Sequence, residues 1–140
     1  MNRMDSRDAA GGADGDIRLL IVDDSAIFRE ALAGFLAETE GLRVVGTAAS
    51  GEEGLALVAR LAPAVVLMDL RMEGLDGFEA TRCLKRLSNP PAVVALTTYD
   101  DDRVRRAALA AGADAFVVKR QVGTEIVGVV RALARSGRSQ

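Results

Sequence analysis

Histidine is absent from this 140-residue sequence, and cysteine occurs once, at Cys83. The absence of His excludes metal sites built on imidazole and nucleophiles that an imidazole activates. A single Cys excludes an internal disulfide and is typical of proteins from a reducing compartment. We therefore expect a cytoplasmic protein.

Long apolar runs and a clustered basic surface are missing as well. No apolar run approaches the roughly 20 residues that span a bilayer, and residues 1–16 are too polar for a signal peptide, so we expect no contact with a membrane. The net charge is −2 and the pI is about 5.2, which argues against direct nucleic-acid binding. A local basic group, Arg103, Arg105 and Arg106, is better explained as the solvated face of a helix.

The length suits one domain with one core, and the chain divides into three parts. Residues 1–16 are rich in Gly and Asp, and we expect them to form a disordered extension. Residues 17–135 alternate between short apolar segments and segments with helical periodicity, so we expect them to form the folded domain. Residues 136–140 are expected to be a polar tail.

Short apolar segments that lack alternation predict five buried β-strands. They are residues 17–22, 43–47, 64–69, 92–96 and 114–118. A predicted helix follows each strand, and Ser50 with Glu53 forms a capping-box pattern at the start of the second helix. The first helix is expected to bury one apolar stripe, made of Ile27, Ala31, Phe35 and Leu36.

Strict alternation of strands and helices predicts an α/β fold. Because crossovers between parallel strands are right-handed, the five strands are expected to form a doubly wound parallel sheet with five helices on its two faces. The common strand order for such sheets is 2-1-3-4-5, which places the first and third strands side by side.

Acidic residues end two of these neighbouring strands. Asp23 and Asp24 follow the first strand, and Asp69 ends the third, at the sheet edge where ligands bind in folds of this class. Three crowded carboxylates repel one another, which costs stability unless a cation lies between them. Mg²⁺ prefers such oxygen ligands and often binds a phosphate at the same time.

The two remaining strand ends suit a phosphoryl group. The Thr97 hydroxyl and the Lys119 ammonium can bind its oxygens, and the central Asp69 is the candidate nucleophile, which would form an acyl phosphate. Each residue alone has an ordinary explanation, such as a helix cap, a turn or a surface cation. The joint pattern favours the functional interpretation.

Four segments together resemble the receiver domain of bacterial two-component response regulators. They are Val-Asp-Asp-Ser at 22–25, Met-Asp-Leu-Arg-Met at 68–72 with Gly-Leu-Asp-Gly-Phe-Glu at 74–79, Leu-Thr-Thr-Tyr at 96–99, and Ala-Gly-Ala-Asp-Ala-Phe-Val-Val-Lys at 111–119. The resemblance covers residues 17–135 and implies the flavodoxin-like version of the fold. Residues 96–101 look most similar to the LuxR/NarL-type receivers, which precede a helix-turn-helix domain.

The resemblance implies that a sensor histidine kinase phosphorylates Asp69. The chain would then be a phosphoacceptor switch in a phosphorelay rather than an enzyme, catalysing only its own phosphorylation and dephosphorylation. The family pattern further implies that Asp24, Asp69 and the backbone carbonyl of Arg71 bind Mg²⁺, with Asp23 acting directly or through water.

The same resemblance assigns Thr97 and Phe116 as the switch pair, which would remodel the surface of the fourth helix, fifth strand and fifth helix. This surface would control an output protein or output domain, in a monomer or a phosphorylation-dependent dimer. Arg71, Thr98 and Tyr99 match positions that tune dephosphorylation. Because Phe116 stands where the family often has Tyr and lacks its hydroxyl, we expect it to point inward even without phosphorylation.

Several alternatives remain at this point. A nucleotide- or flavin-binding module would need a Gly-rich turn after the first strand, where this chain has Asp23-Asp24-Ser25. A phosphatase with an aspartyl nucleophile would need an Asp-x-Asp pattern, which is absent, and a receiver that only docks would not need the intact site. Since only five residues follow Arg135, the receiver either acts alone through a protein partner or is a fragment of a longer regulator.

Overall fold

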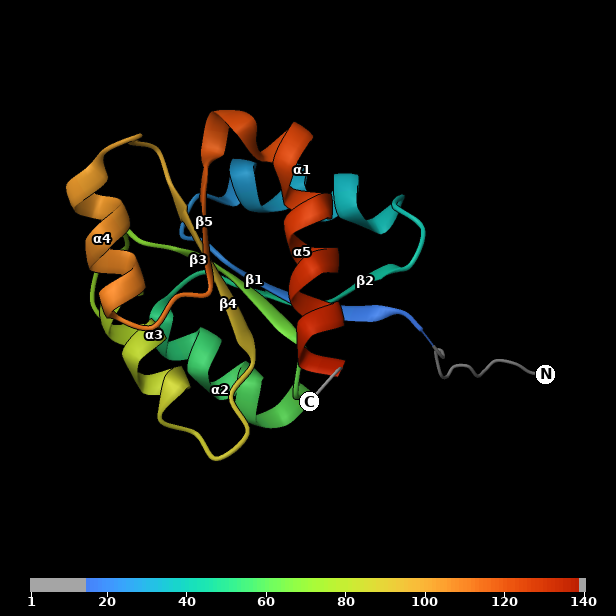
Figure 1. Cartoon of the computed structure of the whole chain (residues 1–140), viewed down its shortest axis with the longest axis horizontal. Helices are drawn as coiled ribbons and strands as arrows, with labels where there is room; N and C mark the ends of the chain where they lie inside the picture. The colour runs from blue at the N-terminus through green and yellow to red at the C-terminus, as the bar shows by residue number, and fades with distance from the viewer. Residues whose placement is uncertain (1–14, 139–140) are drawn as a thin grey trace.

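The computed structural model describes residues 15–138 and shows strands alternating with helices (Figure 1). The strands are β1 (Ile17–Val22), β2 (Leu42–Ala48), β3 (Val65–Asp69), β4 (Ala92–Thr97) and β5 (Ala115–Val118). The helices are α1 (Ala26–Ala37), α2 (Gly51–Leu61), α3 (Gly77–Lys85), α4 (Asp102–Ala110) and α5 (Val122–Arg138), with a short 3₁₀ helix, η1 (Lys119–Gln121), before α5. The expected disorder of residues 1–16 falls mostly on residues 1–14, which lie outside the described part of the chain.

The five strands form one sheet in the order β2-β1-β3-β4-β5, and every neighbouring pair is parallel. The predicted fold class and strand order are therefore confirmed. Strand β3 lies in the centre, and all five of its residues are buried. This burial explains why its sequence is continuously apolar up to its final carboxylate.

Helices cover both faces of the sheet, as Figure 1 shows. Val66 and Met68 of β3 belong to the core under α2, α3 and α4. Val65 and Leu67 point the opposite way, into the core under α1 and α5. Successive side chains of one strand thus supply both cores, because they alternate between the faces of the sheet.

The buried stripe of α1 differs from the one expected. Leu32 and Leu36 are buried, and Phe28 packs beside them, whereas Ile27 is 85% exposed and Phe35 is 42% exposed. Leu36 of the expected stripe is buried as predicted, but Ile27, Ala31 and Phe35 lie one position, or about 100° of rotation, out of phase with the buried face. Both stripes are apolar, so periodicity alone could not choose between them.

The helix ends mostly follow the predicted signals. Ser50 caps α2 by accepting a hydrogen bond from the Glu53 backbone N–H (3.1 Å), while the Glu53 carboxylate accepts one from the backbone N–H of Ala49 (2.8 Å). At the other end of the chain, α5 continues to Arg138, into the segment expected to be a polar tail. Within the described residues, no helix is both long enough and apolar enough to cross a membrane.

Candidate metal centre

The carboxyl ends of β1 and β3 bring three carboxylates together. Asp23 and Asp24 directly follow β1, Asp69 is the last residue of β3, and Val22 of β1 pairs with Met68 of β3. One oxygen from each of the three carboxylates lies within 4.8 Å of the others. The structure therefore brings together the acidic residues that the strand order predicts at one edge.

Asp23 is completely buried and anchors the turn after β1. Its Oδ1 accepts a hydrogen bond from the backbone N–H of Ser25 (2.8 Å), and Ser25 in turn caps α1. Its Oδ2 forms no hydrogen bond, although the Lys119 ammonium lies 2.8 Å away as an ion pair. A buried carboxylate oxygen with only this partner retains lone pairs for a cation.

Asp69 is 4% exposed. Its Oδ1 accepts a hydrogen bond from the backbone N–H of Arg71 (3.3 Å) and lies 3.4 Å from Lys119 Nζ. Burial, followed by repulsion from Asp23, raises the pKa of Asp69 from 3.8 to about 6, while Lys119 acts in the opposite direction. The carboxylate is thus destabilised in its ionised form until more positive charge is supplied.

Thr97 ends β4 beside this cluster. The residue before it, Leu96, pairs with Asp69, and Thr97 itself pairs with Val118, directly before Lys119. The Thr97 side chain is buried, and its hydroxyl accepts a hydrogen bond from the backbone N–H of Tyr99 (3.1 Å). In this arrangement the hydroxyl proton remains available for another acceptor.

The loop between β3 and α3 closes the site, and its backbone at Gly77 lies very close to the backbone at the end of β3. The backbone N–H of Leu70 donates to the Leu96 carbonyl (3.0 Å), and that of Gly77 donates to the Leu70 carbonyl (3.2 Å). A Cβ at position 77 would collide with the backbone of Asp69 and Leu70, so the loop needs Gly there. This constraint holds the end of β3 in place.

A cleft of about 480 Å³ opens beside the carboxylates. Its lining residues are Asp24, Leu70, Arg71, Met72, Glu73, Asp76 and Phe78. Asp24 lines this cleft and is exposed, whereas Asp23 and Asp69 are buried. The acidic rim favours a cation, because a phosphate anion alone would be repelled.

Side chains at the predicted tuning positions lie on the surface near this cleft. Arg71, Thr98 and Tyr99 are exposed, and the Arg71 guanidinium lies over the Tyr99 ring at 5.1 Å from its centroid. The sequence did not predict this contact, since the two residues belong to separate loops. It joins the loop after β3 to the loop after β4.

Phe116 is partly buried rather than fully enclosed. Its ring packs against the core under α2, α3 and α4, and its other surface is covered by the Arg105 guanidinium at 4.6 Å from the ring centroid. The expectation that Phe116 points inward is therefore met only in part. Arg105 is exposed, as expected for a solvated helix face, but its contact with the Phe116 ring was not predicted.

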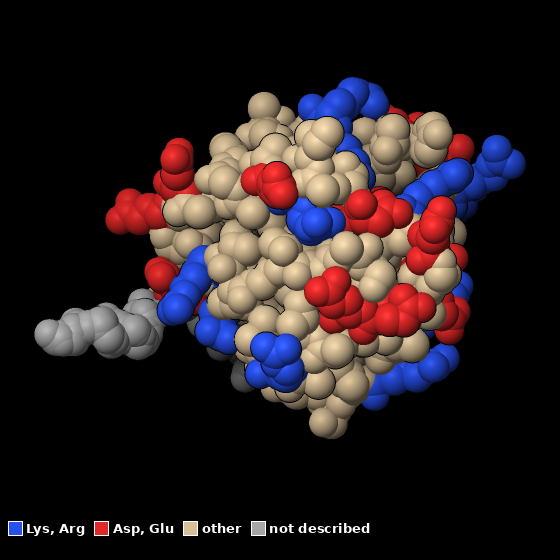
Figure 2. Space-filling view, turned by 180° about the vertical axis from the view of Figure 1, so that it is seen from behind, with Lys and Arg blue, Asp and Glu red and all other residues tan. Residues whose placement is uncertain are grey.

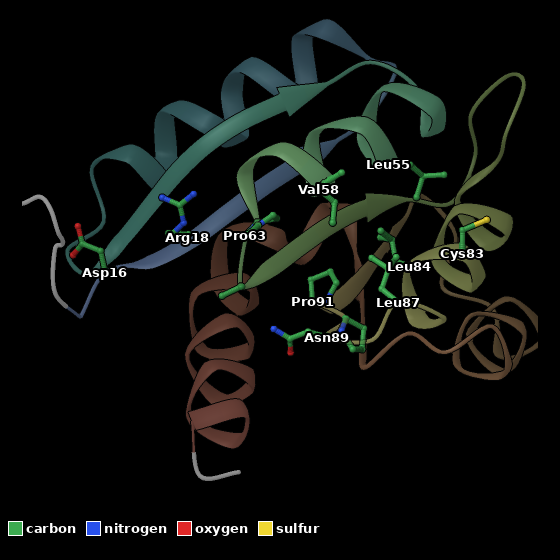
Figure 3. A pocket seen from close by; sticks show the side chains of 14 residues that line it. Asp16, Arg18, Leu55, Val58, Pro63, Cys83, Leu84, Leu87, Asn89 and Pro91 are labelled. Atoms are coloured by element: carbon green, nitrogen blue, oxygen red, sulfur yellow. The ribbon is translucent and has the colours of Figure 1, made fainter.

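Another cavity, of about 600 Å³, lies at the opposite edge of the sheet (Figure 3). Its lining includes Arg18, Pro63, Cys83 and Pro91, which lie near the amino ends of the strands or on α3. It is thus separate from the acidic cluster. On the face seen in Figure 2, Lys and Arg form small groups interspersed with acidic ones.

Comparison with known proteins identifies the class of this fold and site. Residues 19–131 match the family model of the response regulator receiver domain, so the chain belongs to this family. The prediction made from its motifs is confirmed.

The relatives are response regulators of the LuxR/NarL type. The chain is 39% identical over 119 residues to the transcriptional regulatory protein LiaR of Bacillus subtilis (strain 168), covering 85% of this chain and 56% of LiaR. It is 43% identical over 115 residues to the response regulator GacA of Pseudomonas protegens, covering 82% of this chain and 54% of GacA. The chain thus spans about half the length of these relatives.

Solved structures agree with this assignment. The signal receiver domain of the putative response regulator NarL from Mycobacterium tuberculosis superimposes with a TM-score of 0.82 at 31% identity, covering 87% of this chain and 98% of that domain. The response regulator domain of Thermotoga maritima CheB superimposes with a TM-score of 0.79 at 30% identity, covering 86% and 97% respectively.

Asp69→Asn is expected to stabilise the metal-free protein. A carboxyl whose pKa is raised on folding contributes stability below its unfolded pKa of 3.8, and this contribution is lost as the pH rises through about 6. The variant should therefore match wild type near pH 4 and exceed it by about 1–3 kcal/mol at pH 7.5. Urea unfolding in EDTA at both pH values measures the difference, with the exposed Asp102→Asn as control. A difference that does not change with pH would contradict the prediction.

Mg²⁺ is expected to stabilise the wild-type protein. Binding to the folded state alone contributes about 2.7 kcal/mol at 100 times the Kd, and Asp24→Asn or Asp69→Asn should reduce the effect because each removes an oxygen ligand. Because Asp24 is exposed, its replacement should change metal-free stability less than Asp69→Asn does. Thermal melts with EDTA and with Mg²⁺ test this, and an equal Mg²⁺ response in all three proteins argues against a metal site.

Proposed function

We propose that this chain is the phosphoacceptor switch of a two-component phosphorelay and that Asp69 receives a phosphoryl group from a sensor histidine kinase. The observation that supports this proposal most strongly is the placement of Asp69. Its buried carboxylate lies at the carboxyl end of the central strand, within 4.8 Å of two other carboxylates and 3.4 Å from an ammonium. A metal, an anion and a nucleophile can meet at such a point.

The carboxylates fit a hard divalent cation. Asp23, Asp24, Asp69 and the backbone carbonyl of Arg71 would hold Mg²⁺, which would neutralise charge between the nucleophile and the phosphoryl oxygens when bound. The fit rests on the buried, incompletely satisfied Oδ2 of Asp23 and on the all-oxygen donor set. The resemblance to the family supports the same ligands.

The remaining groups would bind the transferred phosphoryl. A carboxylate oxygen of Asp69 forms the new P–O bond while the P–N bond of the donor phosphohistidine breaks. The electron pair of the P–N bond stays on the imidazole nitrogen. The Lys119 ammonium and the Thr97 hydroxyl donate to the phosphoryl oxygens. The chain catalyses only this transfer and the later hydrolysis.

The switch would begin at Thr97. Its hydroxyl now accepts a hydrogen bond from the Tyr99 backbone, and donation to a phosphoryl oxygen would draw the β4–α4 loop toward Asp69. Phe116 and Arg105 join β5 to α4, so movement of this loop would alter the α4–β5–α5 surface. That surface would control an output protein or an output domain, as a monomer or a phosphorylation-dependent dimer.

The receiver domain would extend from residue 17 to 138 rather than to 135, because α5 continues to Arg138, and the extension 1–16 would precede it. The Asp23-Asp24 turn favours this function over nucleotide or flavin binding on a similar sheet. Those ligands need backbone N–H groups aimed at a phosphate, whereas this turn presents carboxylates and its Ser25 N–H is already bonded to Asp23.

Asp69 is expected to be the sole phosphoacceptor. Acetyl phosphate with Mg²⁺ should add one phosphoryl group to wild type, detected by intact mass, and no group to Asp69→Asn, which lacks the nucleophile. The exposed Asp102→Asn serves as a control and should be labelled like wild type. Labelling that persists in Asp69→Asn would refute the assignment.

The contact between Arg71 and Tyr99 is expected to slow hydrolysis of the acyl phosphate, because the stacked side chains lie on the loops that flank Asp69. Tyr99→Ala or Arg71→Ala should shorten the lifetime of the phosphorylated form by about 2- to 5-fold, in keeping with ~0.5–1 kcal/mol for an exposed cation–π contact. The decay of the phosphorylated mass with time measures it. Arg60→Ala, on the exposed end of α2, is the control and should have the lifetime of wild type. Equal lifetimes for Tyr99→Ala, Arg71→Ala and Arg60→Ala would contradict the prediction.

A further inference from the structure

The Lys119 ammonium has an aromatic neighbour as well as two carboxylates. Nζ lies 4.4 Å from the centroid of the Phe28 ring, 2.8 Å from Asp23 Oδ2 and 3.4 Å from Asp69 Oδ1. The side chain is only 18% exposed. An ammonium over the face of an aromatic ring at this distance is attracted by the negative charge density of that face.

The Phe28 ring is held in place by the structure around it. Its backbone N–H donates to the Ser25 hydroxyl that caps α1 (3.3 Å), so the first turn of the helix places Phe28 directly beside the Asp23-Asp24 turn. The side chain packs against the core under α1 and α5 and borders a cleft of about 230 Å³ together with Phe35 and Val122. The ring therefore has packing contacts besides the one with Lys119.

We propose that Phe28 is a positioning residue for Lys119 in phosphoryl transfer, an inference that rests on the function proposed above. When the carboxylates of Asp23 and Asp69 bind a cation and a phosphoryl group, Lys119 loses part of their attraction. The ring does not lose its attraction, because it uses no lone pair that a metal could take. It therefore keeps the ammonium at the site while allowing it to move from the carboxylates to the phosphoryl oxygens.

The test compares the rates of phosphorylation of matched variants by acetyl phosphate with Mg²⁺. Phe28→Leu keeps an apolar side chain but removes the ring, and it should slow phosphorylation by about 2- to 30-fold, the equivalent of ~0.5–2 kcal/mol for a cation–π contact. Phe28→Tyr retains a ring and should restore the rate. Phe35→Leu makes the same change on the same helix, in the same cleft, and should leave the rate unchanged.

A double-mutant cycle separates positioning from packing. In a Lys119→Gln background, Phe28→Leu should cause no further loss, because the ammonium on which the ring acts is gone. An NMR measurement is independent of activity: the ε-methylene protons of Lys119 should be shifted upfield by the ring in wild type and lose this shift in Phe28→Leu. Thermal melts establish that each variant is folded, and Phe28→Met replaces Phe28→Leu if the latter does not fold.

Two results would overturn the inference. One is an equal rate for Phe28→Leu and Phe35→Leu, and the other is a loss of the same size in the Lys119→Gln background, which would make Phe28 a packing residue only. Either result leaves the phosphorylation of wild type intact, so the proposed function would stand. Absence of labelling in wild type itself would instead refute the proposed function, and this inference with it.

Discussion

The ion pair between Lys119 and Asp23, with Asp69 beside it, is the interaction on which the rest of the site depends. Two buried carboxylates at one sheet edge would be strongly destabilising alone. The ammonium lies within 3.4 Å of both, and it can reach them only because β5 ends at the same edge as β1 and β3. The parallel sheet is therefore what makes this arrangement of charges possible.

The compensation is incomplete, and this would favour the proposed role of Asp69 as a nucleophile. The raised pKa of Asp69 shows that Lys119 does not cancel the combined effects of burial and of Asp23. A fully compensated carboxylate would be a more stable but weaker nucleophile, since its lone pairs would be engaged. The protein accordingly holds Asp69 in a state that added positive charge can stabilise, and binding of a cation there would link folding stability to the concentration of that cation.

The sequence predicts the strands one by one, and the fold class that they define supplies the strand order. The gathering of Asp23, Asp24 and Asp69 then follows from where each apolar run ends. The buried face of α1 could not be chosen, because 27/31/35 and 28/32/36 are both apolar. Contacts such as Arg71–Tyr99 and Lys119–Phe28 join side chains from separate elements, so they depend on tertiary positions that no local pattern encodes.

The balance of charge also indicates the order in which ligands can bind. With all groups ionised, three carboxylates against one ammonium leave two negative charges at the site. At the rim of the cleft, Glu73 and Asp76 add two negative charges and Arg71 adds one positive charge, so the excess remains negative. An approaching phosphoryl group, itself anionic, meets repulsion that Lys119 and Thr97 cannot overcome alone. A divalent cation removes this excess. In the proposed function, the carboxylate cluster would thus make phosphoryl transfer conditional on prior binding of the metal, so that the same residues would provide the nucleophile and control access to it.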